Sequence, residues 1–225
     1  MSGPLALVGG GEWTAGCTFD RELLAASEAD EVLVIPAGSA FENPRRALEQ
    51  AGAWFAELGA RARGLDVLTR TDGLVAEHVD AVRAARFTYL IGTSPMHLRS
   101  VLKDSPLYDA LVGAWHDGAV LAGSGAGADV LCDPMVDTRG GAYTVGLGLL
   151  PGLAVIPRVN QWSPEKVRRT VELAPPGVPV VGIPEATALI RDPDGTWRVD
   201  GVGEVTVYLD GALAPLEVLG GIVPR

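Results

Sequence analysis

The stretch Leu121-Ala122-Gly123-Ser124-Gly125-Ala126-Gly127-Ala128, residues 121–128, decides the fold. An apolar strand over 119–122 runs directly into small residues in the order Gly-x-X-x-Gly, where a helix is predicted to begin. This order is typical of a nucleophile elbow, a strained strand-to-helix turn whose central side chain stands over the strand ends. Free N–H groups at the helix start, near Ala126, can stabilise a developing oxyanion. The central residue is Gly125, so the sequence predicts the turn without its nucleophile.

The same glycine-rich stretch also fits a plain tight turn that holds an anion at the helix start. It is not a phosphate-binding P-loop, because no Gly-Lys-Ser/Thr ending follows. The first predicted strand ends in Gly9-Gly10-Gly11-Glu12-Trp13, which does not fit the Gly-x-Gly-x-x-Gly of dinucleotide-binding folds. No metal-ligand spacing appears among the His, Cys, Asp and Glu residues. We therefore expect neither a cofactor nor a metal.

The rest of the chain alternates short apolar runs with helical stretches. Strands are predicted at 5–8, 31–36, 62–68, 87–91 and 119–122, and helices at 19–28, 44–58 and 74–85 with two more within 96–115. Uniformly apolar strands separated by helices indicate an α/β fold, a three-layer α/β/α sandwich around a mostly parallel sheet.

The second half follows a different pattern. Strands are predicted at 154–159 and 178–183 around a helix that starts near 163. Turns at Asp194-Gly195 and Asp210-Gly211 predict a C-terminal antiparallel ribbon that closes one edge of the sheet. No linker interrupts the chain, so we expect one domain over residues 1–225.

Composition narrows the class of protein and its partners. Apolar residues make up 48% and charged residues 20%, which is typical of a folded globular chain and excludes a disordered one. With two cysteines, no secretory signal and no run of ~18 apolar residues, a cytoplasmic protein that spans no membrane is expected. The net charge of −10 repels phosphate backbones, so no nucleic-acid partner is expected. An acidic chain with an exposed sheet edge is compatible with a homodimer.

Five segments, in this order and spacing, resemble the cyanophycinase and dipeptidase E (aspartyl dipeptidase) family of serine peptidases over about residues 5–190. They are Leu-Val-Gly-Gly-Gly at 7–11, Tyr-Leu-Ile-Gly-Thr-Ser-Pro-Met-His-Leu at 89–98, Gly-Ser-Gly-Ala-Gly-Ala at 123–128, Gly-Leu-Gly-Leu-Leu-Pro-Gly at 146–152 and Gly-Ile-Pro-Glu-Ala-Thr-Ala-Leu at 182–189. The resemblance implies a fold like that of class I glutamine amidotransferases, with flavodoxin-like topology.

The resemblance also places the family's catalytic residues. The family's pattern at the turn reads Gly-Thr/Ser-Ser-Ala-Gly-Ala, and its catalytic serine falls on Gly125. The family's histidine falls on Arg158, and no histidine follows His116 in this chain. An acidic third member would fall within 137–141, where we assign no residue.

A second family segment, Gly-Gly-Asp/Asn-Gln, helps to form the oxyanion hole and to hold substrate. It falls on Gly92-Thr93-Ser94-Pro95, so Gly92, Thr93 and Ser94 are candidates for that role, and only Gly92 matches the family.

The two departures remove the family's chemistry. Serine hydrolysis needs a hydroxyl and a base that takes its proton. Glycine has no hydroxyl, and an arginine guanidinium stays protonated. We therefore expect a catalytically inactive pseudoenzyme that binds a small acidic peptide or a carboxylate, with Arg158 and the N–H groups near Ala126 as the binding groups. A surface Arg158 paired with Glu165 or Glu185 is the simpler alternative.

Two other functions stay open. Ser124 is a weak alternative nucleophile for an active peptidase or amidase, but the sequence places no histidine to serve it. A scaffold or oligomerisation protein is the other, and its site would be filled by side chains such as Met96 or Trp162. Lys166, Arg168 and Arg169 are predicted to form a solvated helix face.

Overall fold

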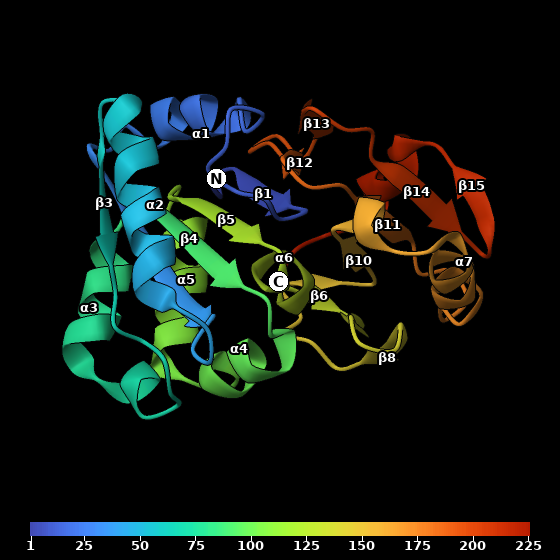
Figure 1. The fold of residues 1–225 in the computed structure, drawn as a ribbon, viewed down its shortest axis with the longest axis horizontal. Coiled ribbons are helices and arrows are strands. Elements are labelled where there is room, and N and C mark those ends of the chain that lie inside the picture. The colour runs from blue at the N-terminus through green and yellow to red at the C-terminus, as the bar shows by residue number, and fades with distance from the viewer.

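The computed structural model describes residues 1–225, and its centre is a seven-stranded sheet (Figure 1). Along this sheet the strands lie in the order β13-β12-β1-β5-β4-β2-β3. Five neighbouring strands pair in parallel, and two more join the sheet through antiparallel pairings. The parallel strands are β1 (Leu5–Val8), β2 (Glu31–Gly38), β3 (Arg61–Gly64), β4 (Phe87–Gly92) and β5 (Val120–Ser124), and the antiparallel ones are β12 (Thr187–Arg191) and β13 (Trp197–Gly201).

The parallel part has the strand order of a flavodoxin-like sheet. Counted from β2, the order β3-β2-β4-β5-β1 is the order 2-1-3-4-5, with the N-terminal strand in the last place. In such sheets ligands bind outside the carboxyl ends of the strands, near the point where the order reverses. That point lies between β2 and β4, whose last residues, Gly38 and Gly92, are paired.

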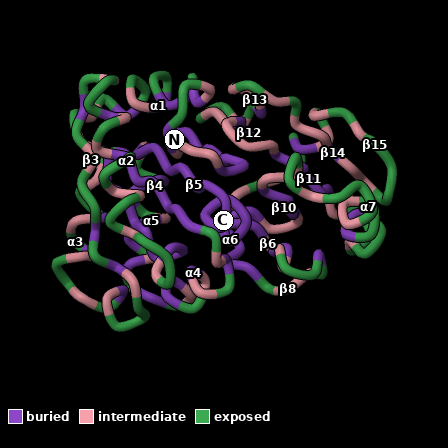
Figure 2. Tube along the Cα trace, in the orientation of Figure 1, coloured by how far each residue is buried: buried purple, intermediate pink, exposed green.

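Helices cover both faces of this sheet, which confirms the predicted three-layer α/β/α sandwich. Alternate residues of β1 point to opposite faces, so Leu5 and Leu7 belong to one core and Ala6 and Val8 to the other. The first core is covered by α3 (Ala76–Ala84), α4 (Pro95–Leu102) and α5 (Pro106–His116), and the second by α1 (Phe19–Ser27) and α2 (Pro44–Glu57). Figure 2 shows the central strands β1, β4 and β5 as almost continuously buried, whereas the edge strand β3 is mostly exposed.

Local sequence signals account for where several elements begin and end. Asn43 caps α2 by accepting a hydrogen bond from the Arg46 N–H at 3.2 Å, with Pro44 as the first helical residue. The strand predicted at 62–68 is the shorter β3, because the chain turns where the Val67 N–H bonds the Leu65 carbonyl. The helix predicted at 74–85 is divided into the 3-10 turn η1 (Asp72–Leu74) and α3, because Val75 between them is extended.

A second sheet lies beside the first, in the order β10-β11-β14-β15 (Figure 1). The predicted C-terminal ribbon is therefore two hairpins in two sheets. The β12–β13 hairpin closes the main sheet against β1, and the β14–β15 hairpin extends the second sheet. The strands of the second sheet are β10 (Ala154–Pro157), β11 (Val180–Ile183), β14 (Thr206–Leu209) and β15 (Ala212–Ala214).

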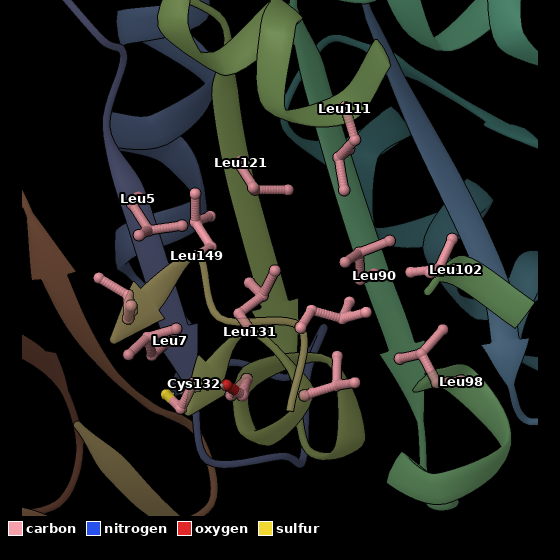
Figure 3. Close-up of a cluster of buried hydrophobic side chains, with 14 of the residues drawn as sticks. Leu5, Leu7, Leu90, Leu98, Leu102, Leu111, Leu121, Leu131, Cys132 and Leu149 are labelled. Carbon is pink, nitrogen blue, oxygen red and sulfur yellow. Dashed lines mark hydrogen bonds between the residues drawn. The ribbon is translucent and has the colours of Figure 1, made fainter. Parts of the chain in front are cut away.

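The remaining elements are short, and those from α6 to β9 connect the main sheet to the second one. In chain order, the remaining elements are α6 (Ala126–Val130), β6 (Cys132–Asp133), β7 (Met135–Asp137), β8 (Ala142–Thr144), β9 (Leu150–Pro151), η2 (Val159–Gln161), α7 (Pro164–Glu172) and η3 (Leu216–Gly221). Figure 3 shows Cys132 among leucines such as Leu7 and Leu131, in the core that α6 and β6 share with the main sheet. None of the helices combines the length and the apolar character that a membrane span requires.

Candidate functional site

The turn between β5 and α6 forms one wall of the candidate site. Its central residue, Gly125, has φ 56° and ψ −111°. Residues that carry a side chain adopt this backbone conformation only with strain. The Gly125 N–H donates to the Val8 carbonyl at 3.0 Å, which fixes the turn against the end of β1. At Gly127 a Cβ would lie 2.2 Å from the Leu90 carbonyl oxygen, so glycine is needed for α6 to pack this closely on β4.

The space beside Gly125 is occupied by the backbone of β4. A Cβ at position 125 would lie 2.8 Å from the carbonyl oxygen of Gly92. Gly92 has φ 139° and is itself pressed against Gly38, where a Cβ would lie 2.0 Å from the Gly38 carbonyl carbon. A serine at 125 therefore fits only if the Gly92 carbonyl shifts, and Gly92 has little room to shift.

A cavity of about 290 Å³ opens in front of this turn, at the carboxyl ends of β4 and β5. Five of the predicted site residues line it: Gly92, Thr93, Gly125, Ala126 and Arg158. Thr138, Pro157, Gln161, Trp162 and Lys166 complete the lining. We call this cavity the Gly125 pocket. Its lining contains two cationic side chains and no acidic one.

Arg158 reaches the pocket from the end of β10. The backbone N–H of Arg158 donates to the Gly9 carbonyl at 2.7 Å, and the residue has a left-handed backbone conformation with φ 52°. The Arg158 Nε lies 3.6 Å from a Glu185 carboxylate oxygen and has no hydrogen-bond partner. The other Glu185 oxygen accepts from the Gln161 amide at 2.9 Å. Of the two acids considered from the sequence, the partner is thus Glu185, but the contact is loose and Arg158 still faces the pocket.

The two predicted serines lie outside the lining of the pocket. Ser124 is fully buried, and its hydroxyl donates to the Glu12 carboxylate at 2.7 Å. The sequence places no histidine for Ser124, and its partner Glu12 lies 112 residues away along the chain. Ser94 stands at the start of α4, and its side chain makes no capping hydrogen bond. Thr93 lines the pocket, and its hydroxyl donates to the Glu42 carboxylate.

Lys166 is the main site residue that the sequence analysis missed. The prediction of a solvated helix face is wrong for it, because its ammonium lies 3.5 Å from the centre of the Trp162 ring and donates to the Thr138 carbonyl. Burial lowers the pKa of Lys166, and the nearby Arg169 lowers it further. The available signal was a tryptophan just before the N-cap Ser163 of α7 and a lysine in the first turn of that helix.

Two buried carboxyl groups support the elements around the pocket. Asp20 accepts hydrogen bonds from the Trp54 indole at 3.0 Å and from the Tyr89 hydroxyl at 3.3 Å, and burial raises its pKa to about 7. Asp129, in α6, accepts from the Val136 N–H at 2.8 Å, and burial holds its pKa well above the usual range. Asp129 thereby connects the turn at Gly125 to β7, which leads to the pocket residue Thr138.

The family profile of peptidase family S51 matches residues 5–197. The chain belongs to peptidase family S51. This S51 chain is 30% identical over 168 residues to the cyanophycinases of Synechococcus elongatus and Thermosynechococcus vestitus, a match that covers 68% of the chain and 51% of each relative. It is 27% identical over 164 residues to the cyanophycinase of Nostoc sp., covering 55% of that relative. The chain thus spans about half the length of these relatives.

Solved structures confirm the predicted fold class of the S51 chain. The crystal structure of a peptidase from an acI-B1 Actinobacterium superposes with a TM-score of 0.85 at 28% identity, covering 100% of this chain and 98% of that one. A candidate peptidase E from Listeria monocytogenes EGD-e has the same fold, with a TM-score of 0.70 at 18% identity over 90% of this chain. The predicted resemblance to the dipeptidase E and cyanophycinase family is confirmed.

The residues that line the pocket of the S51 chain do not include a serine–histidine pair. They include two threonine hydroxyls but no serine, cysteine or histidine. Gly125 has no reactive atom, and the guanidinium of Arg158 cannot take a proton. What the lining does offer is positive charge, from Arg158 and Lys166. Such a site can bind an anion by charge-assisted hydrogen bonds.

Proposed function

We propose that this S51 chain binds a small acidic peptide or a free carboxylate in the Gly125 pocket and does not cleave peptides by the serine–histidine route. The observation that carries the proposal is that Gly125 and Arg158 line one open pocket. A guanidinium binds a carboxylate through two parallel hydrogen bonds, and Arg158 is only loosely paired with Glu185. Because α6 has only five residues, its N-terminus adds little to the binding, and Arg158 is the main binding group.

The alternatives have less support. An active peptidase that uses Ser124 needs a hydroxyl that a substrate can reach, and Ser124 is fully buried. A scaffold protein with a closed site needs side chains that fill the pocket. Met96 is exposed and does not line the pocket, and Trp162 lines it without closing its volume of about 290 Å³.

Calorimetric titration with an aspartyl dipeptide tests the binding part of the proposal. Arg158→Gln is expected to weaken binding at least tenfold, because a hydrogen bond to a charged group contributes about 1.5–3 kcal/mol and about 1.4 kcal/mol is tenfold. Arg168→Gln is the matched control, since Arg168 pairs with Glu172 and lines a neighbouring groove. An affinity unchanged by Arg158→Gln would contradict the proposal.

A product-release assay tests the catalytic part. The native chain and Ser124→Ala are expected to show no turnover of aspartyl dipeptides. Turnover by the native chain that disappears in Ser124→Ala would instead support the active peptidase. The double variant Gly125→Ser/Arg158→His returns the family's two residues, so peptidase activity in that variant would support the assignment of both positions.

A further inference from the structure

The two cations of the Gly125 pocket come from different elements and have different partners. Arg158 follows β10, and its one ion pair is the 3.6 Å contact with Glu185. Lys166 lies in α7, and its ammonium is bound to neutral groups only, the Thr138 carbonyl and the Trp162 ring. Asp137 raises the pKa of Lys166 through its charge but forms no ion pair with it, because the Arg139 guanidinium binds that carboxylate at 2.9 Å. Lys166 thus has no acid partner of its own, and Arg158 has only the loose contact with Glu185.

The residues that line the pocket carry positive charge, whereas the protein as a whole has a net negative charge. The chain has 28 acidic against 18 basic residues, yet the ten residues that line the pocket include two basic ones and no acidic one. A partly desolvated cation without an opposite charge is unfavourable, and an anionic ligand removes that cost. Arginine suits a carboxylate because its planar fork forms two hydrogen bonds, whereas lysine acts as a compact point charge.

We propose that the Gly125 pocket selects a ligand with two separate anionic groups, one bound by Arg158 and the other by Lys166. The inference rests on the proposed function and adds a second binding point to it. The ligand class is a dicarboxylate, or a carboxylate that carries a second anionic group such as a phosphate. The pocket volume of about 290 Å³ leaves room for a chain of atoms between the two groups.

Calorimetry with simple probes tests the inference. The native chain is titrated with acetate, succinate, glutarate and inorganic phosphate, and at least one dicarboxylate is expected to bind tenfold or more tightly than acetate. Lys166→Met keeps the unbranched side chain over Trp162 and removes the charge, so it is expected to reduce that ratio to near one while acetate still binds. Lys166→Arg keeps the charge and is expected to preserve most of the ratio.

The matched control is Arg168→Met, which removes one positive charge from the same helix but outside the pocket. It is expected to leave the ratio of dicarboxylate to acetate affinity unchanged. Thermal unfolding of each variant checks that it is folded.

Each failure has a different signature. If Lys166→Met keeps the native ratio while Arg158→Gln still loses binding, the two-anion inference is wrong and the proposed function stands. Phosphate binding as tightly as the best dicarboxylate would mean that both cations converge on a single group, which also overturns the inference. If no probe and no aspartyl dipeptide binds to the native chain, the proposed function itself fails.

Discussion

At the scale of single residues, the close approach of Gly125 to Gly92 leaves little room for a side chain at position 125. The conformation of Gly125 is strained for any residue with a side chain, and the Gly92 carbonyl oxygen lies only 2.8 Å from where a Cβ at position 125 would be. We predict that Gly125→Ser lowers the free energy of unfolding by about 1–3 kcal/mol, from backbone strain and crowding together. Urea unfolding measures this change.

The control for this prediction is another glycine in open space. Gly113 is exposed in α5, and a Cβ there meets nothing within 4 Å. Gly113→Ala is expected to raise the free energy of unfolding by about 0.5–1 kcal/mol, since glycine weakens a helix interior. A Gly125→Ser variant as stable as the native chain would show that the Gly92 carbonyl moves aside without cost.

Asp20 makes the stability of the protein depend on pH. Its pKa is about 7 when folded, mainly because of burial, and about 3.9 in an unfolded chain. The folded state therefore holds a proton that the unfolded state has lost between about pH 4 and pH 7, and stability falls as pH rises through this window. Asp20→Asn keeps an oxygen for Trp54 or Tyr89 and cannot ionise. We predict that the native chain loses up to about 4 kcal/mol relative to this variant between pH 4 and pH 8.

Urea unfolding across this pH range measures the difference between the two chains. Asp66→Asn is the control, because Asp66 is exposed and its replacement is expected to leave the pH profile unchanged. A constant difference between the native chain and Asp20→Asn from pH 4 to pH 8 would mean that Asp20 ionises in the folded protein as it does in water.

At the scale of elements, α7 holds the β7–β8 loop over the pocket. Lys166 donates to the Thr138 carbonyl, and the Arg169 guanidinium donates to the Gly140 carbonyl at 2.8 Å. These two contacts come from neighbouring positions on one helix face and bind successive parts of the loop. The same helix covers the outer face of the second sheet, where Val171 packs with Ile156.

Trypsin cleavage after Arg139 reports on this loop, since Arg139 is exposed at its tip. We predict that Lys166→Ala/Arg169→Ala is cleaved there several times faster than the native chain, because the loop opens more often once both contacts are lost. Arg168→Ala is the control on the same helix, with its contact to Glu172 directed elsewhere. Equal cleavage rates in all three chains would mean that other contacts hold the loop.

At the scale of the whole molecule, the two sheets share one hydrophobic core. The largest cluster of buried side chains contains Leu5 and Leu7 of the main sheet together with Val155, Val181 and Val207 of the second sheet. Figure 3 shows part of this core, where Leu131 and Leu149 lie against β1 and β5. Removing either sheet would expose apolar surface of the other.

We predict that both sheets unfold in a single cooperative transition, as expected of one domain. Hydrogen exchange in increasing urea measures this, and amides of β5 and β11 are expected to exchange at the same free energy of opening. Exchange of the β11 amides through an opening that costs several kcal/mol less than that of β5 would divide the chain into two units.

The elements of the main sheet could be predicted because their signals are local. Continuous apolar runs place β1, β4 and β5, and glycine follows or ends each run. Asn43 and Pro44 mark the start of α2, and Asp194-Gly195 marks the hairpin between β12 and β13. Gly125 and Arg158 were singled out by their spacing within family segments, and the folded chain brings both to one pocket.

Tertiary structure alone decided the rest. The contact between Ser124 and Glu12 joins residues 112 positions apart, and no periodic pattern reports such a pair. Whether a hairpin extends the first or the second sheet, and whether Lys166 faces water or a pocket, depends on what packs beside each element. Apolar periodicity shows which face of an element is buried, because burial depends on how apolar each residue is. It does not show which residues pack against that face, because those neighbours are brought there only when the whole chain is assembled.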